Sequence, residues 1–148
     1  MRNGFTLVEL ILVVAMMAVV GAMTAPFLQT FQTRSDLVTT ADSITHQLRR
    51  AQQNAAAGQN GNGWGVFFNP GNKTMTLYYG TSYASRDQSF DQIDSLPTAF
   101  TFSTDFSDDI YFNVFSGQAS ASGTVTITDQ NNQTKKIVIT GASIIKRQ

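Results

Sequence analysis

The sequence contains no cysteine, a single histidine and only three prolines. The absence of cysteine excludes disulfides, thiolate metal sites and a cysteine nucleophile. The single histidine, His46, has no second imidazole with which to hold a metal, and we expect it to be a solvated helix residue. The chain also contains no G-x-S-x-G nucleophile elbow and no Walker loop. These absences predict a protein that is not an enzyme and that carries no cofactor and no metal.

Charge is scarce as well, because charged residues make up 14% of the chain and the formal net charge is zero. No overall field therefore attracts nucleic acid or an anionic membrane surface, and an electrostatic partner must be met locally. A length of 148 residues suits one compact domain with an appendage.

The longest apolar stretch lies near the start of the chain. No charged residue occurs from Leu10 to Thr33, and Leu7–Leu28 is long enough to cross a membrane as a helix. About 20 residues rising about 1.5 Å each span a hydrocarbon core of about 30 Å. Arg2 precedes this stretch, so the positive-inside bias predicts a cytoplasmic N-terminus and an exported remainder.

A secretory signal peptide and a plain single-pass anchor are two alternative interpretations. A signal peptide has a shorter apolar run and a small-x-small cleavage site, whereas Met23-Thr24-Ala25 lacks the first small residue and precedes Pro26. A plain anchor has no use for Glu9, whose carboxylate is costly near the start of a membrane helix unless it is paired. The helix dipole stabilises a carboxylate there by at most about 1 kcal/mol. A stronger partner is a cation at the same depth, such as an α-amine freed at Phe5.

The residues around this carboxylate resemble a known signal. Gly4-Phe5-Thr6-Leu7-Val8-Glu9, behind the basic leader Met1-Arg2-Asn3, is similar to the class III signal of type IV prepilins and type II secretion pseudopilins. The resemblance implies that an aspartyl prepilin peptidase cleaves between Gly4 and Phe5 and methylates the new Phe5 amine. It also implies that Glu9 pairs with the Phe5 amine of a neighbouring subunit.

Gly21 and Pro26 lie where this family interrupts its helix in assembled filaments. Proline removes a backbone donor and crowds the preceding turn, at a cost of about 3 kcal/mol in a regular helix interior. The alternatives are a simple kink at the membrane exit for Pro26 and close helix packing for Gly21.

Beyond the apolar stretch, the helical pattern continues to about Ala57, where the glycine-rich segment 58–63 ends it. One apolar stripe recurs at spacings of four and three, formed by Leu37, Ala41, Ile44, Leu48, Ala51 and Ala55. β-rich runs follow and predict six strands, at Trp64–Asn69, Thr74–Tyr79, Thr98–Ser103, Ile110–Phe115, Thr124–Thr128 and Lys135–Thr140. The polar segment from Gly80 to Pro97 is expected to be a long surface loop.

The sequence thus predicts an α+β fold in which a long N-terminal helix packs against an antiparallel β-sheet domain. Its expected segments are a prepilin leader at 1–4, a transmembrane and polymerisation half of the helix at 5–28, an amphipathic half at 29–57, and a β-rich domain at 58–148.

The C-terminal half also resembles the GspH/FimT type of minor pilin. The residues that carry this resemblance are Arg49–Gln52 at the helix end and the runs Phe112–Gly117, Gly123–Ile127 and Ile137–Gly141. The two resemblances imply a structural filament subunit whose partners are other pilin or pseudopilin subunits, the prepilin peptidase, the inner-membrane assembly platform with its ATPase, and membrane lipid before assembly. They place the chain in the cytoplasmic membrane before assembly, and in an extracellular filament or the periplasm afterwards.

Major and minor subunits remain alternatives, as do a pilus for attachment or motility, DNA uptake and type II secretion. The second hypothesis is a minor pilin at a filament tip, or a membrane-anchored module, that binds DNA or a surface. Some relatives take up DNA, and Lys135, Lys136, Lys146 and Arg147 near the C-terminus are candidate phosphate contacts. The alternative for these four residues is solvated tail charge, because no aromatic residues are interleaved with them.

Three aspartates, Asp105, Asp108 and Asp109, form an acidic middle of the chain. Carboxylate oxygens of this kind could hold calcium, but their spacing matches no EF-hand. A solvated acidic loop is the alternative that the sequence favours.

Overall fold

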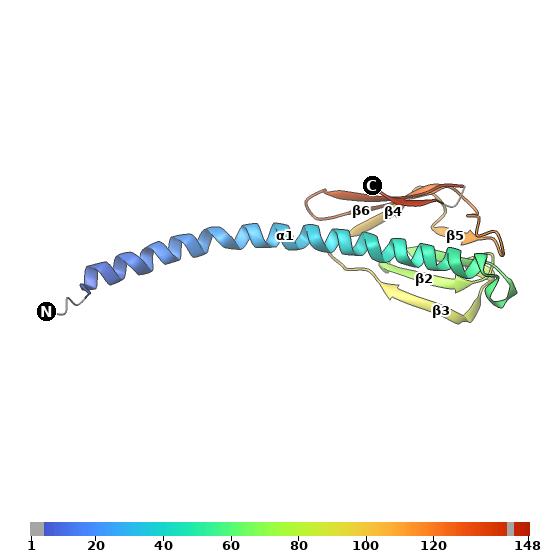
Figure 1. The fold of residues 1–148 in the computed structure, drawn as a ribbon, viewed down its shortest axis with the longest axis horizontal. Helices are drawn as coiled ribbons and strands as arrows, with labels where there is room; N and C mark the ends of the chain where they lie inside the picture. Colours follow the sequence, from blue (N-terminus) through green and yellow to red (C-terminus); the bar gives the residue numbers. More distant parts are fainter. Residues whose placement is uncertain (1–4, 142–143) are drawn as a thin grey trace. The chain divides into compact units, whose positions relative to one another are not determined.

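The computed structural model describes the backbone of residues 5–141 and 144–148, with the side chains of these residues except at 23–31. The chain divides into two compact units, an N-terminal unit, Met1–Ser35, and a C-terminal unit, Asp36–Gln148. Helix α1 (Leu7–Ala56) contributes residues to both units (Figure 1). The predicted segment boundaries at residues 4, 28 and 57 stay predictions.

Helix α1 ends one residue before the predicted position near Ala57. Gly58 has a φ of 65°, in the left-handed region where glycine is favoured, and its N–H donates to the Ala55 carbonyl at 2.9 Å. The Phe115 N–H donates to the same carbonyl at 2.8 Å. The Phe115 ring lies over Gly58, where an added Cβ would stand 2.3 Å from Phe115 Cε1. The glycine-rich stop signal is therefore confirmed.

Two four-stranded antiparallel sheets complete the C-terminal unit, each built around central strands with apolar residues at alternating positions. Sheet A has the order β3-β2-β1-β5 and sheet B the order β4-β6-β7-β8. The strands of sheet A are β1 (Trp64–Asn69), β2 (Thr74–Tyr79), β3 (Asp87–Ser95) and β5 (Asp109–Phe112). The strands of sheet B are β4 (Thr101–Thr104), β6 (Gly123–Thr128), β7 (Thr134–Ile139) and β8 (Ile145–Arg147). Short 3₁₀ turns, η1 (Gln59–Gly61) and η2 (Tyr83–Ser85), precede β1 and β3.

The predicted apolar stripe of α1 is buried in full. Leu37 is 2% exposed, and the remaining members of the stripe are 0% exposed. They form one hydrophobic cluster with inward residues of both sheets, including Phe68 and Leu77 of sheet A and Ile127 and Ile137 of sheet B. The fold is thus the predicted α+β architecture of a helix against antiparallel sheets, with two sheets where one was expected.

Two strands, β3 and β8, lie where the sequence predicted none, and β3 corrects the expected 80–97 loop. Strand β3 pairs with β2 along a single edge, and all of its residues are exposed or half-buried. An edge strand of this kind is held by backbone hydrogen bonds, so its polar side chains give no apolar alternation. Strand β8 is only three residues long and pairs with β7. Both are edge strands of their sheets.

A buried tyrosine ties β2 to the first residue of β5. The Tyr78 side chain is 0% exposed, and its hydroxyl donates to Asp109 Oδ1 at 2.5 Å. Asp109 Oδ2 accepts the Tyr83 N–H at 3.0 Å. Burial, and then the Asp109 carboxylate, raise the pKa of Tyr78 far above its usual range. The ring also covers Gly65, where an added Cβ would stand 2.3 Å from the Tyr78 hydroxyl oxygen.

We predict that Gly65→Ala destabilises the protein by about 1–3 kcal/mol, because the new methyl group forces the buried Tyr78 ring out of place. Chemical denaturation measures the change in the free energy of unfolding. Gly71→Ala is the matched control, since a Cβ at Gly71 meets only Asn69 Oδ1, at 3.5 Å. Equal stability of the two variants would contradict the packing described for Tyr78.

We also predict a loss of stability in alkali that depends on Tyr78. The unfolded chain releases the phenol proton above about pH 10, whereas the folded chain retains it because its pKa is raised. The stabilisation is therefore fully present below about pH 10, and the free energy of unfolding falls above it by up to about 1.4 kcal/mol per pH unit. Denaturation curves across this range should show a shallower fall for Tyr78→Phe. An identical slope in both proteins would rule out the contribution of Tyr78.

Candidate functional site

The described helix of the N-terminal unit exposes a continuous apolar surface. Phe5 is 81% exposed, and Leu7 and Met17 are 74% and 71% exposed. The other large apolar side chains of this surface are each at least 42% exposed, and they are Val8, Leu10, Ile11, Leu12, Val13, Val14, Met16, Val19 and Val20. Contiguous apolar surface of this extent marks a contact with protein or membrane in a folded chain. Among the described residues, no helix combines the length and the apolar character that crossing a membrane requires.

Glu9 lies in the first turn of α1, and Thr6 caps that turn. The Glu9 N–H donates to Thr6 Oγ1 at 3.3 Å, and the Leu10 N–H donates to the Thr6 carbonyl at 3.2 Å. Because α1 starts at Leu7, Glu9 is its third residue, the acidic position of a T-x-x-E capping box. The positive end of the helix dipole favours a carboxylate at this position. The T-x-x-E spacing was visible in the sequence, but the part played by Thr6 was missed.

Several other predicted positions in this unit are only partly covered by the structure. Gly4 lies outside the described residues, so the junction with Phe5 stays a prediction. At Gly21 an added Cβ would meet no atom within 4 Å. The backbone of α1 is helical through Gly21 and Pro26, and the Pro26 side chain lies outside the described residues. The helix interruption implied for an assembled filament therefore stays a prediction.

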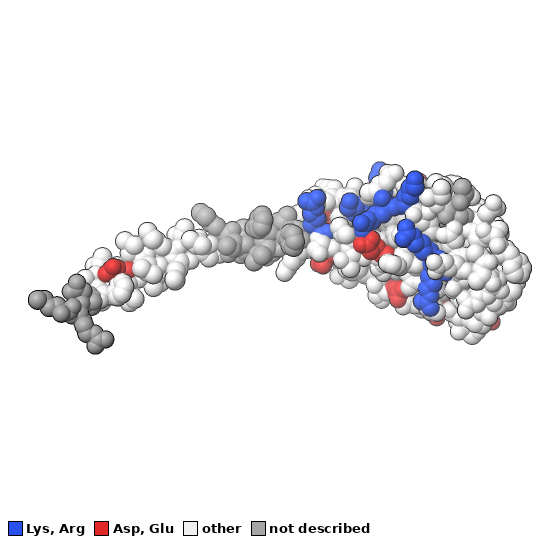
Figure 2. Space-filling model, viewed as in Figure 1, with Lys and Arg blue, Asp and Glu red and all other residues white. Residues whose placement is uncertain are grey.

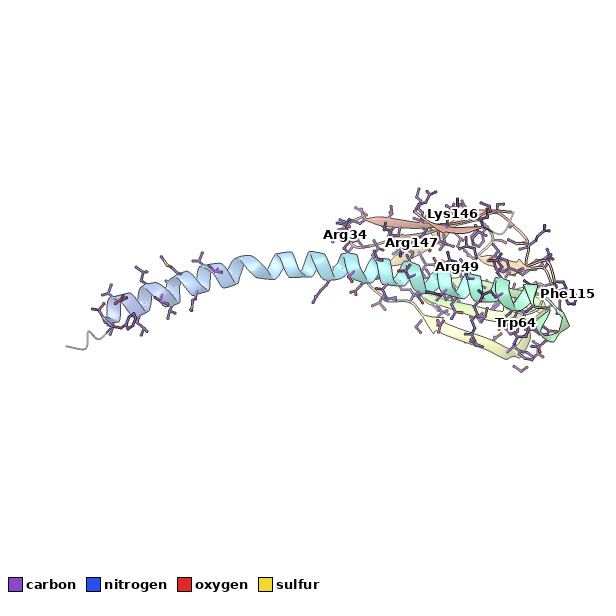
Figure 3. All side chains as sticks on the ribbon, viewed as in Figure 1. Arg34, Arg49, Trp64, Phe115, Lys146 and Arg147 are labelled. Atoms are coloured by element: carbon purple, nitrogen blue, oxygen red, sulfur yellow. The ribbon has the colours of Figure 1, made fainter. Side chains whose placement is uncertain are left out.

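Of the four candidate DNA contacts, the two on β8 lie on opposite faces of sheet B. Successive strand residues point to opposite faces. Arg147 is the partner of Ile137, which is fully buried, so Arg147 lies on the face that meets α1. There it forms an ion pair with Asp42 of the helix. Lys146 points to the outer face (Figure 3).

Strand β7 separates the other two residues in the same way. Lys136 shares the outer face with Val138, the partner of Lys146. Lys135 shares the face of the buried Ile137. The four cations therefore do not form one patch, because strand alternation divides them two and two.

The acidic middle of the chain is engaged in local hydrogen bonds. Asp105 Oδ1 accepts the Thr124 N–H at 2.5 Å, and Asp108 accepts the Thr104 hydroxyl. Asp109 holds Tyr78 and Tyr83, as described above. Over residues 5–141 and 144–148, no three or more carboxylates or imidazoles gather closely enough to hold a metal ion. The calcium hypothesis therefore receives no support from these aspartates.

A polar groove over α1 is the feature of the C-terminal unit that sequence reasoning missed. It encloses about 500 Å³ and is lined by Ser43, His46, Gln47, Arg49, Arg50 and Gln53. His46 is exposed there, as expected for a solvated helix residue. Figure 2 shows basic side chains gathered on this face of the C-terminal unit. A helical spacing of polar residues signals a solvated face, but it gives no sign of the strands that border it.

A helix packed against two antiparallel sheets, preceded by an apolar helical segment with a carboxylate in its first turn, defines a type IV pilin-like fold. Among solved structures, the chain is similar to two structures of the minor pseudopilin EpsH from the type 2 secretion system of Vibrio cholerae. Their TM-scores are 0.60 and 0.58, at 11% and 12% sequence identity. The match covers 76% of this chain and 96% and 93% of theirs. The chain therefore has the pseudopilin fold.

Comparison by sequence gives no further relative. No protein-family model and no curated protein matches the chain. The similarity thus lies in the arrangement of the elements, which is retained although few residues are shared.

We predict that Thr6→Ala weakens the first turn of α1 by about 1 kcal/mol, because the Glu9 N–H loses its side-chain acceptor. Hydrogen exchange of the Glu9 and Leu10 amides, measured on the full chain in detergent micelles, should then be about five-fold faster. Thr6→Ser keeps the hydroxyl and should exchange like the original chain. Unchanged exchange in Thr6→Ala would show that this cap does not stabilise the helix.

Proposed function

We propose that this chain is a structural subunit of a type IV pilus-like filament and has no enzymatic activity. The single observation that carries the proposal is the exposed apolar surface of the N-terminal unit, with a carboxylate in the first turn of the same helix. Fully burying one large apolar side chain stabilises a protein by about 1.5–3 kcal/mol. A helix with this surface gains most by packing against lipid and then against identical helices of other subunits.

Processing and membrane insertion belong to this proposal. The leader is removed after Gly4, the new amine of Phe5 is methylated, and the apolar helix holds the subunit in the cytoplasmic membrane until assembly. The N-terminus then faces the cytoplasm and the C-terminal unit is exported. The partners are the prepilin peptidase, the assembly platform with its ATPase, and neighbouring subunits.

The role of Glu9 follows from the energetics of charge in an apolar environment. An unpaired carboxylate at the centre of a membrane costs about 2.5–3.5 kcal/mol on insertion scales, and less near the surface. The dipole of α1 offsets at most about 1 kcal/mol of this. The amine of Phe5 on a neighbouring subunit supplies a full positive charge in the same apolar layer. Assembly then removes the unpaired charge, so it favours one axial register between neighbouring helices.

Type II secretion is the machine that the similarity supports best. The structures that resemble this chain are minor pseudopilins of such a system. We therefore propose a minor pseudopilin rather than a major pilin. Gly21 and Pro26 would soften the helix within the filament, in keeping with the cost of proline inside a regular helix.

We predict that Glu9→Ala leaves membrane insertion intact and reduces incorporation into filaments by at least about ten-fold. The reason is that each subunit contact loses its charge compensation, a loss of about 1.4 kcal/mol or more. Sheared filaments are quantified against the membrane-bound pool with an antibody to the C-terminal unit.

Glu9→Asp is the matched control, since it keeps the charge and should assemble better than Glu9→Ala. Mass spectrometry of the filament fraction reads the N-terminus, which should be methylated Phe5. A filament yield from Glu9→Ala equal to that of the original chain, or a filament subunit that retains Met1, would overturn the proposal.

A further inference from the structure

The polar groove over α1 is bordered by the edge strand of each sheet. On one side, the Gln47 side-chain amide donates to Asp94 of β3. On the other side, the Arg49 guanidinium donates to the Ile145 carbonyl of β8 at 3.5 Å. The groove is lined by α1 alone, and we call its two sides, where Gln47 meets β3 and Arg49 meets β8, its rims. The outer edges of β3 and β8 have no partner strand within the described chain.

Two arginines in this groove have no carboxylate partner within the described residues. Arg49 makes a single hydrogen bond within the described residues, to the backbone carbonyl of Ile145, and Arg50 makes no hydrogen bond or ion pair there. The neighbouring Arg147 differs, because Asp42 already pairs with it. A guanidinium without a carboxylate offers a planar set of donors that matches a carboxylate or a phosphate in two-point contact. The groove thus presents two positive charges that the protein itself does not neutralise.

The shape of the groove favours an extended chain. Its floor runs from Ser43 to Gln53, which spans about 15 Å along a helix. About five residues of extended polypeptide cover that length at about 3.3 Å per residue. The unpaired backbone edge of β3 can add hydrogen bonds to such a chain, as in recognition by strand addition.

The acids at the rims decide between a peptide and a nucleic acid. Asp42 lies beside Arg147 on the β8 side, and Asp94 lies on the β3 side. A nucleic acid carries a phosphate at every nucleotide, so its charges would also lie against these carboxylates. A peptide can place acidic residues on the arginines alone and neutral residues at the rims. Like charges in contact oppose binding, so the charge pattern favours the peptide.

We propose that this groove binds an extended acidic segment of another protein chain, with Arg49 and Arg50 pairing with its carboxylates. The interaction is independent of the apolar surface of the N-terminal unit, so it does not require filament assembly. It gives the C-terminal unit a site that selects its partner by charge.

The test uses the full-length chain in neutral detergent micelles and a fluorescent peptide of alternating aspartate and serine. Fluorescence anisotropy should detect binding that weakens as salt is added, because the contacts are ionic. The same peptide with asparagine in place of aspartate should not bind. The double variant Arg49→Gln/Arg50→Gln should bind the acidic peptide at least about ten-fold more weakly, since two charge-assisted contacts are lost.

The matched control is Lys136→Gln/Lys146→Gln, which removes the same charge from the outer face of sheet B. It should bind within about two-fold of the original chain, because its residues lie on the face of the sheet away from α1. Thermal unfolding checks that both double variants are folded. Should the arginine pair prove unstable, Arg50→Gln alone replaces it, since Arg50 makes no hydrogen bond or ion pair within the described residues.

Three results would overturn the proposal. Equal loss of binding in the arginine and lysine variants would show that binding depends on the overall charge of the protein and not on the groove. Equal binding of the asparagine peptide would remove the role of the carboxylates. Tighter binding of a single-stranded oligonucleotide, abolished by Arg49→Gln/Arg50→Gln, would assign the groove to nucleic acid.

Discussion

The C-terminal unit depends on a single stripe of α1 that serves two sheets at once. The core is filled by the large side chains of Leu37, Ile44 and Leu48. The small side chains of Ala41, Ala51 and Ala55 occupy little space between the helix and the sheets. The inward residues of both sheets meet in one cluster with this helix. The stripe is narrow, as expected when a helix is buried on one side only. The remaining faces of α1 are therefore left to solvent and to partners.

The first part of the same helix exposes its large apolar side chains, whereas the stripe in the C-terminal unit is buried. Its large apolar side chains from Phe5 to Val20 are exposed in the single chain, which leaves them available to lipid or to other subunits. Apolar contact is not directional, and by itself it would allow neighbouring helices to slide past each other. Glu9 is the one formal charge among the described residues of this unit before Arg34. A charge in an apolar layer has a strongly preferred position beside an opposite charge. Such a pair fixes the axial position of one helix against its neighbour.

How far the sequence predicts this structure depends on which interaction places each element. Every residue of the buried stripe of α1 was predicted, because the apolar residues that recur at helical spacing are the ones that the fold buries. Strands β1, β2 and β6 were also predicted, since their apolar residues fill the core. Strand β3 was missed because backbone pairing to β2 holds it and its side chains are polar. The positions of Lys146 and Arg147 depend on the register with β7, which adjacent positions in a sequence do not reveal.

The groove was missed for a related reason. The same reason explains how two chains can share a fold at 11% sequence identity. A core requires only apolar residues of suitable size in the right pattern, so many sequences satisfy it. The groove instead depends on which polar residues occupy the solvent side of α1 and on the edge strands that border it. The arginines at 49 and 50 can therefore define what this chain binds without changing how it folds, whereas the buried stripe defines the fold without selecting a partner.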